Sequence, residues 1–85
     1  MLRMTRILVD GMVTLQLEGK LLAPWIDELT QMVNDPTQGL IRTLDLAHVD
    51  YIDTAGARLL SRLHRNGLRL EGCSPFVASL IDLHN

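Results

Sequence analysis

Residues 43–60 read TLDLAHVDYIDTAGARLL, and this stretch decides the fold. Ile41, just before it, and Leu44 and Leu46 are the apolar residues on the strand side, and they are typical of a strand with a buried face. We therefore expect a strand over residues 40–49. Farther along, apolar residues recur at helical spacing, and this pattern predicts a helix over residues 54–67. A strand that leads into a helix is the building unit of α/β domains.

The predicted helix has recognisable ends. Asp53 and Thr54 are both N-cap candidates, because a short polar side chain can accept a hydrogen bond from a free N–H of the first turn. Gly67 suits the C-terminal stop. The apolar stripe that should face the sheet consists of Gly56, Leu59, Leu60 and Leu63.

The sequence upstream predicts a β-hairpin. Asp10-Gly11 is a strong signal for a two-residue turn, because glycine accepts the positive φ that such turns need. Apolar and polar residues then alternate over residues 13–18, as in a half-buried strand. Gly19 is expected to end this strand.

The remaining segments predict two more helices and a short strand. An amphipathic helix is expected over residues 22–33, with Pro24 in its first turn and a stop at residues 34–36. Residues 68–73 favour a fourth strand, and a last helix is expected from Ser74, with Phe76/Val77 and Leu80/Ile81 as its apolar stripe. The order β-β-α-β-α-β-α predicts one small α/β domain over residues 1–85, with a mixed sheet of about four strands and about three helices.

Composition excludes several classes of function. The chain has 85 residues, 47% of them hydrophobic, and a net charge of −2, which gives no support for binding nucleic acid. No apolar run approaches the ~20 residues of a membrane span, so we expect a cytoplasmic protein. Cys73 is the only cysteine, and no ligand spacing converges on His48 or His64. We therefore predict no metal, no cofactor and no enzymatic activity.

Asp53-Thr54-Ala55-Gly56 is also the tetrapeptide with which small GTPases read a γ-phosphate. A nucleotide switch further needs a glycine-rich loop with a lysine and a following hydroxyl. Lys20 is the only lysine, and Leu21 stands where Ser or Thr is required. The chain is therefore not interpreted as a GTPase.

The wider stretch resembles the STAS domain family of anti-sigma factor antagonists. In that family a strand ending in Asp-Leu-Ser is followed by a short apolar run, then Asp-Ser-Ser-Gly and a leucine-rich helix. Residues 44–47 match the strand end, residues 51–56 match the turn, and Leu59-Leu60 match the helix. Residues 13–29 are similar to the first half of the family pattern.

The resemblance implies a non-catalytic domain that binds a partner through this turn and helix. The usual partner is a kinase-like anti-sigma factor, which phosphorylates the second hydroxyl of Asp-Ser-Ser-Gly. Ala55 occupies that position here and has no hydroxyl, so we expect a state that is permanently competent to bind. The remaining candidate for phosphorylation is Thr54.

The helix after the turn also carries a basic stripe, because Arg58, Arg62 and Arg65 follow i, i+4, i+7 spacing. The interpretation as a docking face competes with that of a solvated helix surface. The predicted partner-binding residues are Tyr51, Asp53, Thr54, Ala55, Gly56, Arg58, Arg62 and Arg65.

Other partners stay open at this point. STAS subunits of lipid-transport ABC systems have a similar Asp-Thr-x-Gly turn and dock on an ATPase. A small module that binds a nucleotide or lipid at the turn after the central strand is a further alternative. Family members usually continue with another strand and helix beyond the equivalent of residues 84–85, so we also expect a homodimer.

Overall fold

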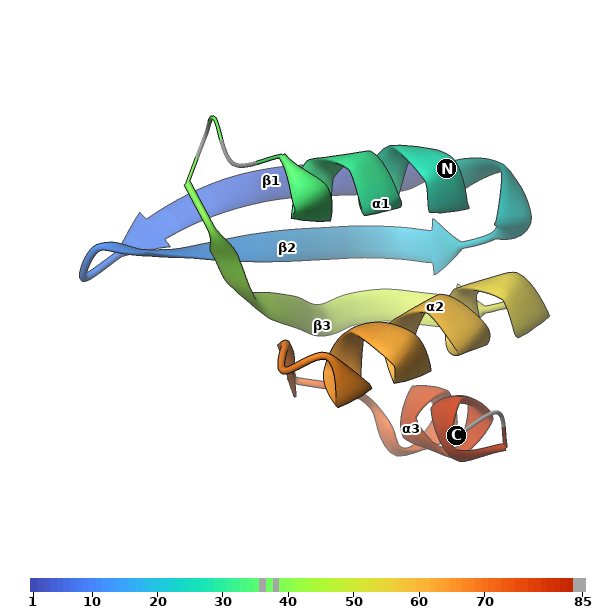
Figure 1. The fold of residues 1–85 in the computed structure, drawn as a ribbon. Coiled ribbons are helices and arrows are strands. Elements are labelled where there is room, and N and C mark those ends of the chain that lie inside the picture. Colours follow the sequence, from blue (N-terminus) through green and yellow to red (C-terminus); the bar gives the residue numbers. More distant parts are fainter. Residues whose placement is uncertain (36, 38, 84–85) are drawn as a thin grey trace.

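The computed structural model describes residues 1–35, 37 and 39–83. In chain order the elements are β1 (Leu2–Val9), β2 (Met12–Leu21), the short 3-10 helix η1 (Ala23–Trp25), α1 (Ile26–Asn34), β3 (Ile41–Ile52), α2 (Thr54–Arg65), β4 (Arg69–Glu71) and α3 (Pro75–Asp82). Figure 1 shows their arrangement. Pro36, which belongs to the predicted helix stop, lies outside the described residues.

The four strands form one mixed sheet in the order β1-β2-β3-β4. The hairpin strands β1 and β2 are antiparallel, whereas β3 is parallel to both β2 and β4. The parallel pairs follow from the helical crossovers α1 and α2, which return the chain to the same end of the sheet. The predicted α/β fold and its order of elements are confirmed.

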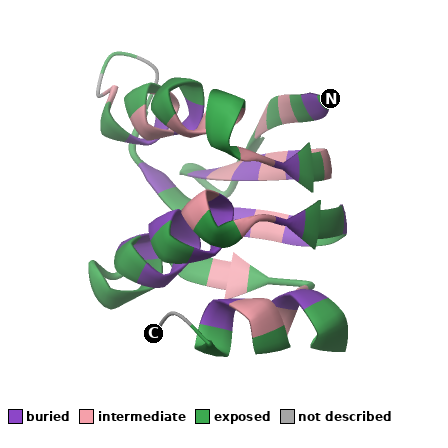
Figure 2. Ribbon diagram, turned by 90° about the vertical axis from the view of Figure 1, so that its right-hand side faces the viewer, coloured by how far each residue is buried: buried purple, intermediate pink, exposed green. Residues whose placement is uncertain are grey.

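Two helices cover one face of this sheet, and no helix of the described residues lies on the other face, called the open face below (Figure 2). The helices α1 and α2 lie side by side on the covered face, and α3 lies at the β4 edge. The core between helices and sheet is aliphatic; its fully buried side chains include Leu15, Leu17, Leu21, Leu29, Leu44, Leu46 and Leu60. No helix in the described ranges is long and apolar enough to cross a membrane.

The central strand β3 is longer than predicted, because it continues to Ile52 instead of ending near residue 49. Its buried residues after Leu46 are Val49 and Ile52, three residues apart. Irregularities in the β2–β3 register accompany this spacing. A bulge moves side chains out of period two, so the pattern no longer indicates a strand.

The expectation that Gly19 ends β2 was wrong. The strand runs on to Leu21, and Gly19 lies inside it with a φ of +107°. A β-carbon at this position would overlap the carbonyl oxygen of Met1. The helix predicted from residue 22 begins instead with η1, which contains Pro24, and α1 proper starts at Ile26.

Gly19→Ala should therefore destabilise the protein more than Gly67→Ala. Both glycines have φ above +100°, so each alanine suffers backbone strain of about 1–2 kcal/mol or more. Only at Gly19 does the new β-carbon also meet main chain, because the space around Gly67 is open. Urea denaturation of both variants measures the difference in the free energy of unfolding, and equal losses would contradict this account.

Candidate docking surface at the turn between β3 and α2

Asp53 connects this turn to the segment that follows β2. Its Oδ1 accepts a hydrogen bond from the Gly56 N–H at 2.9 Å and caps α2. Its Oδ2 accepts one from the Ala23 N–H at 2.7 Å. The Asp53 N–H in turn donates to the Leu21 carbonyl at 3.2 Å. Of the two predicted N-cap candidates, Asp53 is the cap, and it also fixes η1 against α2.

Gly56 allows the first turn of α2 to approach the sheet closely. A β-carbon built on it would lie 2.7 Å from the Leu21 carbonyl oxygen and 3.1 Å from that residue's Cγ. Gly56 is also buried, so the surface available to a partner does not include it. Its role at this turn is to position the helix.

Thr54 and Ala55 present their side chains outside this packed turn. Thr54 is exposed and Ala55 is partly exposed. Because Asp53 supplies the cap, the Thr54 hydroxyl is not needed for that role. On α2, Thr54 precedes Arg58 by four residues and Arg62 by eight, so all three share one face of the helix.

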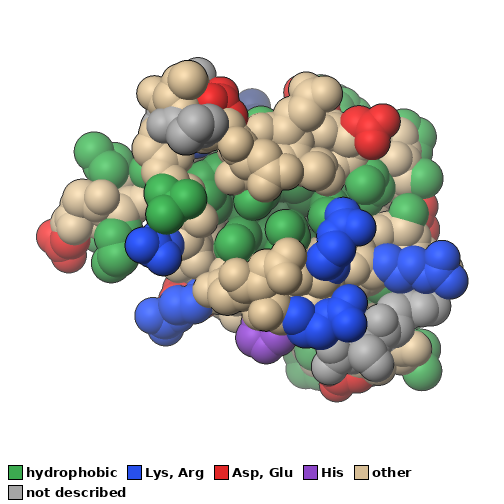
Figure 3. Space-filling view, viewed as in Figure 1, with side chains coloured by type: hydrophobic (Ala, Val, Ile, Leu, Met, Phe, Trp, Pro, Cys, Tyr) green, Lys and Arg blue, Asp and Glu red, His purple; other side chains and the backbone are tan. Residues whose placement is uncertain are grey.

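The arginines of α2 are exposed on the side opposite its buried stripe. Figure 3 shows Lys and Arg side chains gathered over this helix. In the described part of the chain, the ion pairs are Arg3–Glu18 and Arg69–Glu71, and neither involves α2. The positive charges of Arg58, Arg62 and Arg65 are therefore not neutralised by a carboxylate of the described residues.

Sequence reasoning missed an aromatic contact beside the turn. Tyr51, at the end of β3, stacks on Phe76 of α3 with ring centroids 6.2 Å apart. Tyr51 is 40% exposed and Phe76 is 55% exposed. Phe76 was expected in the buried stripe of the last helix, but Val77 and Ile81 occupy that stripe. The sequence carried no local signal for this difference, because the pairs Phe76/Leu80 and Val77/Ile81 have the same i, i+4 spacing.

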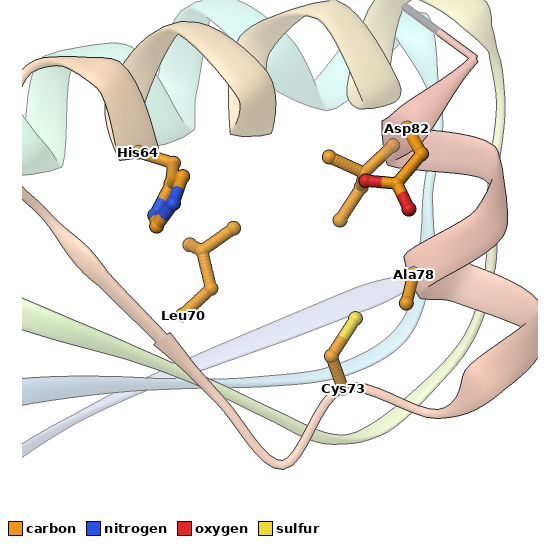
Figure 4. A pocket seen from close by; sticks show the side chains of 6 residues that line it. His64, Leu70, Cys73, Ala78 and Asp82 are labelled. Carbon is orange, nitrogen blue, oxygen red and sulfur yellow. The ribbon is translucent and has the colours of Figure 1, made fainter. Parts of the chain in front are cut away.

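A cavity of about 200 Å³ lies at the other end of α2, between this helix, β4 and α3. It is lined by His64, Leu70, Cys73, Ala78, Ile81 and Asp82, and Figure 4 shows the Cys73 sulfur pointing into it. Burial, followed by the negative charge of Asp82, raises the pKa of the Cys73 thiol above its ordinary value. This cavity is not at the turn where a small ligand was predicted.

The acidic residues of β3 do not assemble into a metal site. Asp45 uses its Oδ1 to accept a hydrogen bond from the Ala47 N–H at 3.0 Å, so its side chain binds backbone. Over residues 1–35, 37 and 39–83, no group of three or more His, Cys, Asp or Glu side chains could hold a metal ion.

The comparison with protein families matches the STAS domain over residues 5–84. The chain belongs to the STAS domain family. The resemblance inferred from the turn and its flanking elements is thus confirmed, and it extends across nearly the entire sequence. STAS domains of this kind are generally non-catalytic interaction domains, and in this one the Asp-Thr-Ala-Gly turn joins the central strand to α2.

One solved structure supports this fold. An uncharacterized protein from the DUF3478 family with a SpoIIAA-like fold, from Shewanella loihica PV-4, superposes with a TM-score of 0.56 at 15% sequence identity. The match covers 76% of this STAS domain and 56% of that chain, so it shows the fold alone. A second structure, Mglu in its native form, has a TM-score of 0.45 at 28% identity, with 78% and 22% of the two chains covered. No curated protein matches.

We predict that substitutions of Asp53 can separate the contributions of its two hydrogen bonds to the stability of the protein. An asparagine side chain at this position would keep one acceptor oxygen and serve only one of the two N–H groups, whereas alanine serves neither. Asp53→Asn should lower the free energy of unfolding by about 1 kcal/mol and Asp53→Ala by about 2 kcal/mol. Urea denaturation gives both values, and an Asp53→Asn variant as stable as wild type would contradict the bridging role.

The raised pKa of Cys73 predicts slow alkylation. Only the thiolate reacts with iodoacetamide, so the rate in the folded protein should reach half its maximum at higher pH than in the urea-unfolded protein. Asp82→Asn should lower this midpoint only part of the way, because burial is the larger cause. Identical midpoints for folded and unfolded protein would show that the thiol is not shielded.

Proposed function

We propose that this STAS domain is a non-catalytic regulator of the anti-sigma factor antagonist type, which docks a kinase-like anti-sigma factor in the bacterial cytoplasm. Its docking surface comprises Tyr51, Asp53, Thr54 and Ala55 of the turn together with Arg58, Arg62 and Arg65 of α2. Gly56 supports this surface from behind. The partner contributes an acidic surface.

The observation that carries this proposal is the exposed arginine face of α2. Its three guanidinium groups have no carboxylate partner in the described ranges, although the chain as a whole is acidic, with a net charge of −2. A local positive surface on an acidic protein favours encounter with an acidic surface of a partner. Arginine also suits such contacts because its planar group can bind a carboxylate with two hydrogen bonds.

Ala55 supports constitutive docking. A phosphate at the family's usual position would add about two negative charges next to the arginine face and alter its complementarity. Alanine cannot be phosphorylated, so that change is not available at residue 55. Thr54 is exposed and free of the capping role, which makes it the residue where phosphorylation would have to occur.

The Asp-Thr-x-Gly turn favours a second candidate, an accessory subunit of a lipid-transport ABC system. The same surface would then contact an ATPase. The two candidates predict different partners for the same arginines, so the identity of the bound protein separates them.

We predict that the charge-reversing double variant Arg58→Glu/Arg62→Glu loses its partner. Immobilised wild-type protein should retain a kinase-like anti-sigma factor from a lysate of its own host, and the double variant should retain at least about tenfold less. Quantitative mass spectrometry identifies and measures the retained protein. Recovery of an ATPase instead would favour the ABC-transport candidate.

The matched control is Arg42→Glu/Arg69→Glu, which makes the same change in net charge at exposed residues of β3 and β4. Retention by this control should equal that of the wild type. Equal losses in both double variants would mean that net charge, and not the face of α2, governs binding. Retention unchanged in the α2 variant would refute the proposed surface.

A further inference from the structure

The strand β1 forms one edge of the sheet and has no partner on its outer side among the described strands. Long edge strands with exposed apolar side chains are prone to pair with another chain. Near the hairpin turn, Leu8 is 71% and Val9 is 52% exposed, and at the opposite end Met1 is 94% exposed. Hydrophobic side chains are visible at the hairpin end of the molecule, on the left of Figure 3.

The main chain of β1 alternates between its two sides, as it does in every antiparallel pair. The Lys20 N–H donates to the Met1 carbonyl at 3.4 Å, and the register continues without interruption to Val9 opposite Met12. Counting in twos from Met1, the odd-numbered residues turn their N–H and C=O groups toward β2. The even-numbered residues from Leu2 to Leu8 turn theirs away from the sheet, where a further strand could bond to them.

The side chains of β1 alternate between the two faces of the sheet. Even-numbered residues lie on the helix side, where Leu2 is buried and the Arg6 Nη2 donates to the Met32 carbonyl of α1 at 3.3 Å. Odd-numbered residues lie on the open face, where Arg3 pairs with Glu18 at 4.0 Å. A strand added beside β1 must therefore match the alternation of its main-chain N–H and C=O groups as well as the alternation of its side chains between the two faces.

A second copy of β1 can meet these requirements by pairing antiparallel about a two-fold axis that passes through one residue. An axis through Arg3 or Arg6 would place like charges opposite each other, which is destabilising. An axis through Met4 or Ile7 leaves one end of the strand unpaired. An axis through Thr5 pairs residues along the full strand and places no arginine directly opposite another arginine.

We propose that β1 pairs antiparallel with β1 of a second copy of this chain, in the register centred on Thr5. On the helix side, Leu8 then lies opposite the partner's Leu2. On the open face, Val9 lies opposite the partner's Met1, and Ile7 opposite the partner's Arg3. Val9 and the partner's Met1, which are both exposed in the single chain, thus cover one another, and the exposed Leu8 gains an apolar neighbour. The interface is isologous and closes after two copies.

This interface leaves the arginine face accessible. The strand β1 is at the opposite edge of the sheet from β4, and α2 follows β3. Dimer formation and partner docking can therefore be tested independently, and failure of one leaves the other standing.

Substitutions of Ile7 test whether β1 is the interface and whether its register is centred on Thr5. Its side chain lies on the open face of the sheet and is 36% exposed, so charged substitutions there do not enter the core. Ile7→Glu should tighten the dimer and Ile7→Lys should weaken it, since each places its charge opposite the partner's Arg3. With two symmetry-related pairs, we expect the dissociation constant to change by about 2- to 30-fold in each direction, as measured by sedimentation equilibrium.

Leu8→Pro provides a second variant, because it removes an N–H that points away from β2. It should abolish the dimer while circular dichroism stays that of the wild type. Phe76→Lys on α3 is the control and should leave the dissociation constant unchanged. The proposal is overturned by a wild-type monomer at every accessible concentration, by a dimer that survives Leu8→Pro, or by Ile7 variants that shift the constant in the same direction.

Discussion

The carboxylate of Asp53 connects the start of α2 to the segment after β2, and the position of the arginine face depends on this connection. One oxygen caps α2 and the other binds the N–H of Ala23, so the helix start and the crossover after β2 are fixed to each other. This arrangement requires α2 to begin directly against the end of β2, which only a glycine at position 56 permits. The orientation of the whole helix, and of the side chains it exposes, follows from this contact.

A helix fixed in this way can present a preformed surface. Leu59, Leu60 and Leu63 anchor the inner side of α2 in the core, so the backbone that carries the arginines on its outer side is fixed. A partner that binds them then avoids the entropic cost of ordering the backbone, and only side chains lose freedom.

The sequence predicted most of the fold, because its periodicity and turn signals agree. The helix α2 was recognisable from its cap, its stripe and Gly67, and the mixed sheet followed from the order of elements. The two features of the fold that were predicted wrongly, the end of β3 and the role of Gly19, have physical causes. The bulged register concealed the last three residues of β3. The close approach of Met1 to Gly19 is a long-range contact that no local pattern encodes. For the candidate site, the exposed arginines were readable from spacing. The second hydrogen bond of Asp53 and the contact between Tyr51 and Phe76 depend on elements distant in sequence, so only the structure reveals them.

The central claim is that the face of α2 docks a partner without a phosphorylation switch. The most direct measurement is native mass spectrometry of the protein isolated from its own host, with identification of whatever remains bound. The account predicts an unmodified chain in complex with a kinase-like anti-sigma factor. A chain that carries one phosphate, lost in a Thr54→Val variant, would contradict it, because the switch would then persist at the residue before Ala55.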